Sequence, residues 1–172
     1  CSITPDGHCG VTNHKTINLK DTHYSLGVAA NTYLEAGADI IAPSDMMKNT
    51  TKYLKKTIGI NGFIDAPIMS YSSKFKSNLY GPFREAAKSS PKGFDRSSYQ
   101  LPVNDRERAI KSSINNAAQG ADYLMVKPGM TSIDLIADIK SNTLLPTGVY
   151  QVSGEYASMT LLNKEKLGDY IN

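Results

Sequence analysis

Two lysines stand beside apolar runs that could remove them from water. Lys127 follows Leu-Met-Val and precedes Pro-Gly, and Lys74 ends the run Met-Ser-Tyr-Ser-Ser-Lys. Burial disfavours the charged amine, so a buried lysine loses its proton more readily than an exposed one. A neutral amine can attack a ketone and form a Schiff base. Both residues are therefore candidates for covalent catalysis, Lys127 first.

Each lysine also has a purely structural interpretation. The Lys127 stem could pack while its ammonium group reaches solvent. Lys74 could be an exposed loop lysine, like its neighbour Lys76. If the two amines met at one site, each would lower the pKa of the other, which would favour the catalytic interpretation for both.

A short polar stretch carries Cys1, His8 and Cys9. Zinc in proteins takes three or four Cys, His or carboxylate ligands, so the stretch predicts part of a zinc site that needs another ligand from elsewhere. A disulfide between the two cysteines is the alternative. We expect a reduced pair, because no secretory signal precedes them.

The segment from Phe75 to Val103 shows no pattern of a long helix and is rich in Ser, Gly, Pro, Lys and Arg. Long loops in compact domains are commonly lids, so we expect residues 75–103 to close over a site. The residues suited to a small acid are Tyr80, Phe83, Arg84, Arg96 and Gln100. The arginines could bind a carboxylate through their planar fork of donors, or pair with Glu85 and Asp95. The aromatic residues could contact substrate or pack the lid.

Helical patterns alternate with short apolar runs along the chain. One helix carries Leu26, Ala29, Ala30, Tyr33 and Leu34 on one face, with Asp21 as its expected cap and Gly37 as its expected end. Further helices are expected at about 48–57, from a capping box of Asn104 and Glu107 to Gly120, and after Ser132. Strands are expected at 39–42, 66–71, 123–126 and 149–152.

This alternation predicts an α/β fold with a parallel sheet covered on both faces. Polar or reactive residues follow the expected strands, among them Ser44, Lys127 and Ser153. Ser153 could donate to a carboxylate or cap a loop. Active sites of TIM (β/α)8 barrels lie at this carboxyl edge, and such barrels need ~250 residues. We therefore predict a single partial barrel domain over 1–172, with about four consecutive βα units, truncated at both ends.

Composition narrows the class of protein. The chain has 172 residues, 40% hydrophobic, with 19 Lys+Arg against 16 Asp+Glu. The basic residues are scattered, so no nucleic-acid partner is expected. No apolar run approaches the ~20 residues of a membrane span, so no membrane association is expected. We expect a cytoplasmic, cytosolic location, with a plastid as the alternative.

Six motifs occur in one order and closely resemble those of the delta-aminolevulinate dehydratase (porphobilinogen synthase) family. They are Gly7-His-Cys-Gly10, Ile41-Ala-Pro-Ser-Asp-Met-Met47, Ile68-Met-Ser-Tyr-Ser-Ser-Lys-Phe75, Tyr80-Gly-Pro-Phe-Arg-Glu-Ala86, Leu124-Met-Val-Lys-Pro128 and Tyr150-Gln-Val-Ser-Gly-Glu-Tyr156. The resemblance implies a (β/α)8 barrel, a homo-octamer and a lyase of tetrapyrrole (heme) biosynthesis. The implied reaction condenses two 5-aminolevulinate molecules to porphobilinogen.

The resemblance also implies roles for single residues. Lys127 corresponds to the Schiff-base lysine of the propionate-side substrate, and Lys74 to that of the acetate-side substrate. Ser153 would bind the carboxylate of the first substrate. The lid residues Arg84, Arg96 and Gln100 would surround the carboxylate of the second, with Tyr80 and Phe83 beside them. Cys1 and Cys9 would be two of three zinc cysteines, with His8 beside the ligands.

The chain departs from the family at several positions. Lys48-Asn49 stands where Asp-Gly is usual, and the sequence after Ala157 leaves the usual alanine-rich pattern. Ser112 stands where some bacterial members have an acidic magnesium ligand, so no such site is expected. Two alternatives therefore stay open: an inactive or truncated relative, and another Schiff-base aldolase or lyase on the same barrel. We expect the 172 residues alone to be inactive.

Overall fold

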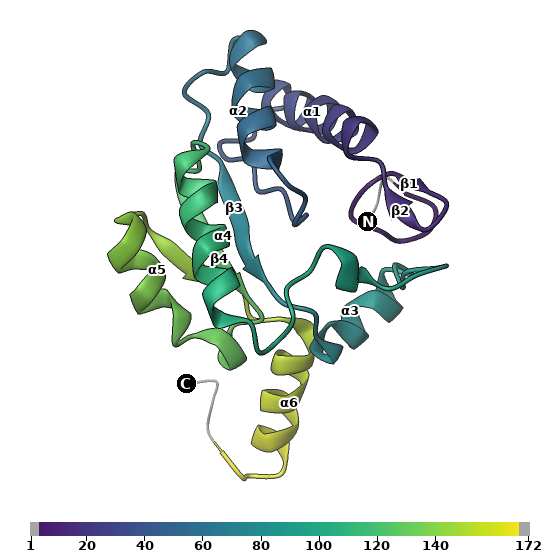
Figure 1. The fold of residues 1–172 in the computed structure, drawn as a ribbon. Helices are drawn as coiled ribbons and strands as arrows, with labels where there is room; N and C mark the ends of the chain where they lie inside the picture. Colours follow the sequence, from purple (N-terminus) through teal and green to yellow (C-terminus); the bar gives the residue numbers. More distant parts are fainter. Residues whose placement is uncertain (1–3, 169–172) are drawn as a thin grey trace.

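A computed structural model describes residues 4–168 (Figure 1). Its helices are α1 (Leu19–Glu35), α2 (Thr50–Ile60), α3 (Gly81–Ala86), α4 (Arg106–Ala118), α5 (Leu135–Thr143) and α6 (Ser153–Lys164). Its strands are β1 (Thr12–Asn13), β2 (Thr16–Ile17), β3 (Met69–Lys74), β4 (Tyr123–Lys127) and β5 (Thr147–Val149). Three short 3-10 turns are η1 (Asn78–Tyr80), η2 (Arg96–Ser98) and η3 (Met130–Ser132).

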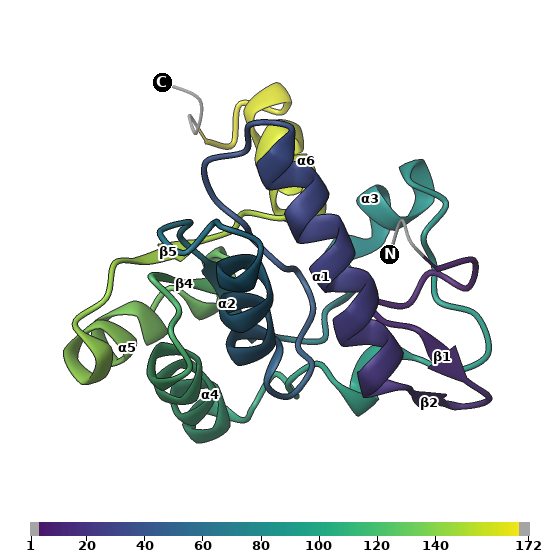
Figure 2. The same cartoon turned by 90° about the horizontal axis from the view of Figure 1, so that it is seen from above.

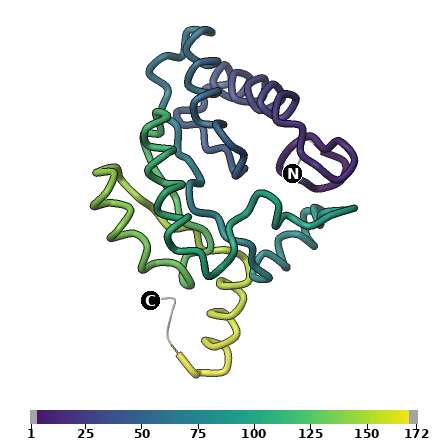
Figure 3. Tube along the Cα trace, viewed as in Figure 1, coloured from purple at the N-terminus to yellow at the C-terminus, as the bar shows by residue number. Residues whose placement is uncertain are grey.

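The central sheet is parallel, with the order β3-β4-β5. The predicted α/β class with a parallel sheet is therefore confirmed. The sequence predicts the first strand at 39–42, which is wrong: this run makes one parallel bridge, between Ile41 and Ile68. It pairs only at the start of β3, where the Ile41 N–H donates to the Pro67 carbonyl at 3.0 Å and the Ile41 carbonyl accepts from the Met69 N–H at 2.9 Å. β1 and β2 form a separate antiparallel hairpin near the N-terminus (Figure 3).

Helices α4 and α5 cover one face of the sheet, as the view from above also shows (Figure 2). Leu124 and Val126 of β4 are fully buried there, in a cluster with Leu135 and Ile139 of α5. A second cluster joins α1 and α2 and includes Leu54 and Ile68. Side chains along β4 alternate between the two faces of the sheet. Leu124 and Val126 therefore face the helices, and Lys127 faces the opposite side.

The interface between β3 and α4 is polar by contrast. The Ser113 hydroxyl of α4 lies 2.8 Å from the Ser72 hydroxyl and 2.9 Å from the Ser73 hydroxyl. The pairing of β3 with β4 shifts register between Ser70 and Ser73, which marks a bulge. The bulge lets both serines face α4, and these buried hydroxyls satisfy one another.

Several predicted boundaries are wrong for identifiable reasons. Helix α1 begins two residues before Asp21, because the Asn18 side chain caps it by accepting from the Asp21 N–H. The cap of α4 is Asp105, which accepts from the Arg108 N–H, rather than a box of Asn104 and Glu107.

The last two predicted elements also shift. Ser132 closes the turn η3, and α5 starts only at Leu135. The fourth strand ends at Val149 rather than Val152, because the Val152 N–H donates to a side chain of α6 instead of to the sheet. β3 begins three residues later than expected and ends on Lys74 itself.

The absence of a long helix between 75 and 103 is confirmed, since α3 spans six residues and the rest is turns and loop. Gly37 and Gly120, expected to end helices, both take positive φ values after α1 and α4, of 96° and 97°. Among the described residues, no helix combines the length and apolarity that a membrane crossing requires.

Candidate active site

Lys74 is buried at the carboxyl end of β3, with 5% of its surface exposed. Its amine donates to the Ser44 carbonyl and lies 3.8 Å from the Cys9 Sγ. Burial lowers the pKa of Lys74, while the nearby Cys9 thiol acts in the opposite direction. The interpretation of Lys74 as an exposed loop lysine is therefore wrong.

Lys127 ends the neighbouring strand and is paired in register with Lys74. Its amine is half-buried and lies 3.8 Å from the centroid of the Tyr150 ring, with the Tyr71 ring at 5.4 Å and the Tyr80 ring at 5.5 Å. Burial, and next the charge of Lys74, lower the pKa of Lys127 to about 8. At pH 7, roughly a tenth of this amine is therefore uncharged and nucleophilic, far more than for an ordinary lysine.

Both lysines line one open cavity of about 740 Å³. It lies at the carboxyl edge of the sheet, between the lid and the start of α6. Its other walls include Tyr71, Tyr80, Phe83, Arg84, Arg96, Tyr150 and Ser153. The structure thus brings together both predicted lysines and five of the six predicted substrate-binding residues.

The two lid arginines differ in how they are held. Arg96 is 6% exposed, and its Nη2 donates to the Gly7 carbonyl at 2.6 Å and the Ser89 carbonyl at 2.9 Å. Arg84 is half-buried and stacks over the Tyr80 ring at 5.1 Å. Asp95, offered as an alternative arginine partner, instead pairs with Lys76 at 2.5 Å. Arg84 presents cationic surface to the cavity, and Arg96 ties the lid to the N-terminal segment.

Gln100, Tyr80 and Phe83 complete the predicted lid residues. Gln100 is 2% exposed, and neither its Nε2 nor its Oε1 has a hydrogen-bond partner within residues 4–168. It is not among the cavity-lining residues. The buried Tyr80 donates to the Phe75 carbonyl at 2.6 Å, whereas Phe83 is 59% exposed. Ser153 accepts from the Phe83 N–H at 3.0 Å, so the lid rests on the start of α6.

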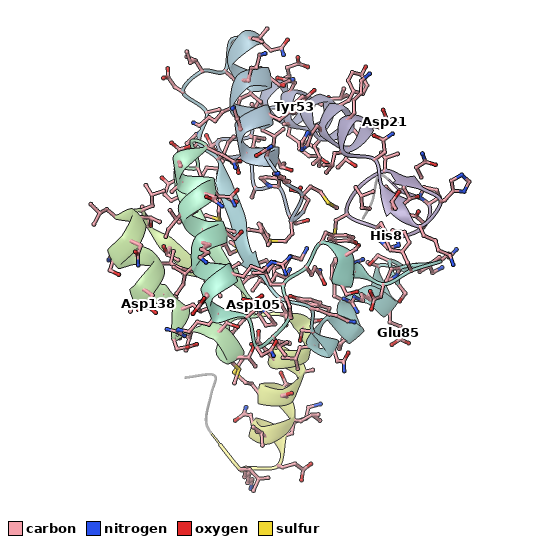
Figure 4. All side chains as sticks on the ribbon, in the orientation of Figure 1. His8, Asp21, Tyr53, Glu85, Asp105 and Asp138 are labelled. Atoms are coloured by element: carbon pink, nitrogen blue, oxygen red, sulfur yellow. The ribbon has the colours of Figure 1, made fainter. Side chains whose placement is uncertain are left out.

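His8 lies between the β1–β2 hairpin and the lid (Figure 4), and Cys9 follows it in the chain. The His8 ring stacks on Phe94, and its two nitrogens contact the Tyr99 hydroxyl at 3.0 Å and the Lys92 carbonyl at 3.1 Å. Burial alone would raise the pKa of Cys9, but the charges of Lys74 and Arg96 outweigh it and lower that pKa. Within residues 4–168, no group of three or more His, Cys, Asp or Glu side chains could hold a metal ion. Cys1 lies outside the described residues.

The sequence reasoning missed the aromatic wall around Lys127. Tyr71 and Tyr150 both line the cavity, and their rings lie 6.1 Å apart. Strict alternation would put Tyr71 and Lys74, three residues apart, on opposite faces of β3. The bulge at Ser70–Ser73 removes that conflict. Tyr150 could have been found as the last aromatic residue of an apolar run that ends at the carboxyl edge.

Comparisons with known proteins agree with this geometry. The family model described as delta-aminolevulinic acid dehydratase matches residues 1–170. The enzyme of that name from Escherichia coli K12 is 47% identical over 157 residues, covering 91% of this chain and 48% of the relative. The one from Helicobacter pylori J99 is 41% identical over 170 residues, covering 99% of this chain and 53% of the relative. The chain therefore spans about half the length of these curated relatives.

A solved structure of the same family is also similar to this chain in its fold. It is delta-aminolevulinic acid dehydratase (porphobilinogen synthase) from Toxoplasma gondii ME49, in complex with the reaction product porphobilinogen. It superposes with a TM-score of 0.92 at 35% identity, covering 96% of this chain and 48% of that one. With the family model matched over nearly every residue, the chain belongs to the delta-aminolevulinic acid dehydratase family.

Proposed function

We propose that the protein carrying this chain condenses two 5-aminolevulinate molecules to porphobilinogen, as a lyase of tetrapyrrole biosynthesis. One observation carries the proposal: Lys74 and Lys127 are register partners on adjacent strands and line the same cavity. A single-lysine aldolase would need only one of these amines. The family membership and the product in the Toxoplasma relative support the same reaction.

Lys127 would form the imine with the propionate-side substrate, and Lys74 would hold the acetate-side substrate. Attack by the neutral amine on the ketone forms a carbinolamine, and protonation of its hydroxyl followed by loss of water gives the iminium. The iminium withdraws electrons from the bound carbon skeleton, which aids C–C and C–N bond formation. The lowered pKa of each amine favours the attacking form.

The lid would position the two acids. Arg84 offers an unpartnered Nε within the described residues, and its pKa is lowered by burial and then by the charge of Arg96. A substrate carboxylate at this point would compensate both charges. Arg96 and Gln100 would support it, with Tyr80 and Phe83 packing beside them, and Ser153 would bind the carboxylate of the other substrate. Such positioning can lower a barrier by several kcal/mol.

A zinc ion is part of the proposal, but the described residues do not complete its site. Cys9 supplies one buried thiol, and its lowered pKa favours the thiolate, which is the form that binds metal. Both nitrogens of His8 already have partners, which agrees with a supporting rather than a ligating role. The remaining ligands would be Cys1 and a cysteine from outside this chain.

Further parts of the proposal concern the whole protein. The βα units of this chain would close into a (β/α)8 barrel with the rest of the polypeptide, and residues 75–103 would act as the lid. The assembly would be a homo-octamer in the cytosol. The parallel order of the sheet and the pairing of Ile41 with Ile68 support a continuing barrel.

Borohydride trapping tests the imine directly. The protein is mixed with 5-aminolevulinate, reduced and digested, and the peptides are mapped by mass spectrometry. We expect a stable adduct on Lys127, and its loss in Lys127→Met. Lys76→Met is the matched control, because Lys76 is exposed and paired with Asp95. An unmodified Lys127 in the wild-type protein would contradict the proposed function.

A further inference from the structure

The Glu155 carboxylate joins two loops of the sheet edge. Glu155 lies in the first turn of α6 and is 3% exposed. One oxygen, Oε2, accepts from the Val152 N–H at 2.7 Å and from the Gly129 N–H at 3.2 Å. The other, Oε1, accepts from the Met130 N–H at 2.6 Å. Three backbone donors from two loops thus converge on one buried carboxylate.

Helix capping explains only part of this arrangement. A glutamate at the third position of a helix commonly accepts from the N-cap N–H, here that of Val152. The other two donors, the N–H groups of Gly129 and Met130, belong to the segment after β4, which starts at the residue that follows Lys127. Glu155 therefore fixes the loop that follows Lys127 to the loop that carries Tyr150 and leads to Ser153 at the start of α6.

The two loops are in close contact where Glu155 joins them. A Cβ atom added at Gly129 would lie 3.3 Å from the backbone of Tyr150 and Gln151, so only glycine fits without movement. Immediately beyond this contact, the Tyr150 ring lies 3.8 Å from the Lys127 amine. The position of the ring over the amine thus depends on how tightly the two loops are held.

We propose that Glu155 is a positioning residue: its carboxylate clamps the Gly129 turn against the Tyr150–Gln151 backbone and thereby sets the Tyr150 ring over the Lys127 amine. This inference rests on the proposed imine chemistry at Lys127. The ring excludes water from the amine before reaction, which favours its neutral form.

The electrostatic surroundings of Lys127 agree with this role. The titratable and charged groups that act on it are Lys74, Cys9 and Arg96, and the nearby rings are Tyr71, Tyr80 and Tyr150. Burial is the largest cause of the lowered pKa of Lys127. Loosening the clamp would admit water and raise that pKa.

Glu155→Gln is the test, with Glu165→Gln at the exposed end of α6 as the matched control. The glutamine keeps the size of the side chain but presents an amide N–H₂ to the backbone donors. The readout is the pH profile of borohydride trapping at Lys127. Each unit by which its pKa rises should slow trapping at pH 7.5 by roughly tenfold, and the deficit should vanish at high pH, where the amine is neutral in every variant.

A purely structural role would give a different result. Glu155→Gln would then lower the melting temperature and reduce trapping equally at every pH, and this outcome would overturn the proposal. An unchanged pH profile would overturn it too. If Glu155→Gln does not fold, Gly129→Ala serves instead, because its Cβ presses the two loops apart while Glu155 stays intact. The same pH-dependent deficit is expected.

A second readout separates this inference from the proposed function. Competitive acetylation reports the pKa of the Lys127 amine without any substrate, with the exposed Lys76 as internal reference. If wild-type Lys127 gives no adduct with 5-aminolevulinate, the proposed function fails. The positioning role of Glu155 is supported if Glu155→Gln raises the pKa of Lys127 measured by acetylation, and it is contradicted if that pKa stays the same.

Discussion

The two candidate lysines occupy equivalent places on adjacent strands yet have different surroundings. The Lys74 amine lies in a polar enclosure, against the Ser44 carbonyl and the Cys9 thiol. The Lys127 amine lies among aromatic rings. A thiol ionises closer to neutral pH than a tyrosine ring does. Burial is the largest cause of the lowered pKa of both amines; the next influence is Cys9 for Lys74, which raises the pKa, and the charge of Lys74 for Lys127, which lowers it.

The strands behind the two lysines differ in the same way. β3 packs on α4 through buried serine hydroxyls, and β4 packs on the same helix layer through Leu124 and Val126. The strand of Lys74 is thus held by directional hydrogen bonds and the strand of Lys127 by apolar packing. Each difference between the two halves of the site can be tested by substitution.

The largest expected effect comes from removing either amine. Lys127→Met and Lys74→Met should each reduce porphobilinogen formation by roughly 10³-fold, about 4 kcal/mol of transition-state stabilisation. The trapping experiment should separate them. Lys74→Met should keep the imine on Lys127, whereas Lys127→Met should lose it. An imine that survives on Lys74 alone would show that the assignment of the two amines is reversed.

Stability gives the next contrast. Leu124→Ala removes a fully buried side chain from the cluster behind Lys127 and should lower the free energy of unfolding by about 2–5 kcal/mol. Chemical denaturation followed by circular dichroism measures this loss. Leu161→Ala, at a position 60% exposed on α6, is the control and should cost little. Equal losses for the two variants would show that β4 is not held by apolar packing.

The rhythm of helices and strands could be predicted from local patterns, because each helix shows an apolar face and each strand an apolar run. The residues that complete the site depend on contacts across the chain. Tyr99 meets His8 from 91 residues away, and Glu155 meets Met130 from 25. No local pattern reveals such pairs. The bulge in β3 likewise depends on the pairing with β4, so the two-residue alternation of a strand sequence cannot predict it.

Candidate residues were predicted better than their surroundings for a related reason. Lys74, Lys127 and the lid arginines stand out because charged groups beside apolar runs need an explanation. Serines do not stand out, so the hydroxyl layer behind β3 went unnoticed. The apolar run 39–42 predicts a strand, but a strand also needs hydrogen-bonded partners along its length, and this run makes one bridge.

A smaller effect should appear in the coupling between the amines. The charge of Lys74 lowers the pKa of Lys127, so Lys74→Met should raise that pKa above about 8. At pH 7.5 the neutral fraction of Lys127 would fall, and acetylation of this residue should slow by up to roughly tenfold per unit of pKa. Lys76→Met should leave the Lys127 profile unchanged. An unchanged or lower pKa for Lys127 in Lys74→Met would show that the charge of Lys74 does not lower the pKa of Lys127.

The smallest expected effect concerns the hydroxyl layer. Ser113→Ala removes the group that contacts the hydroxyls of Ser72 and Ser73. Ser73 keeps its bond to the Ala109 carbonyl at 2.9 Å, but Ser72 is fully buried and loses the contact shown for its hydroxyl. An unsatisfied buried hydroxyl costs about 1–3 kcal/mol, at or below the cost of Leu124→Ala.

The double variant Ser72→Ala/Ser113→Ala removes both partners and should recover part of that loss in stability. Ser112→Ala is the control. If the double variant is less stable than Ser113→Ala by the full cost of a second cavity, then β3 is held by the volume of these side chains and the contrast with β4 disappears.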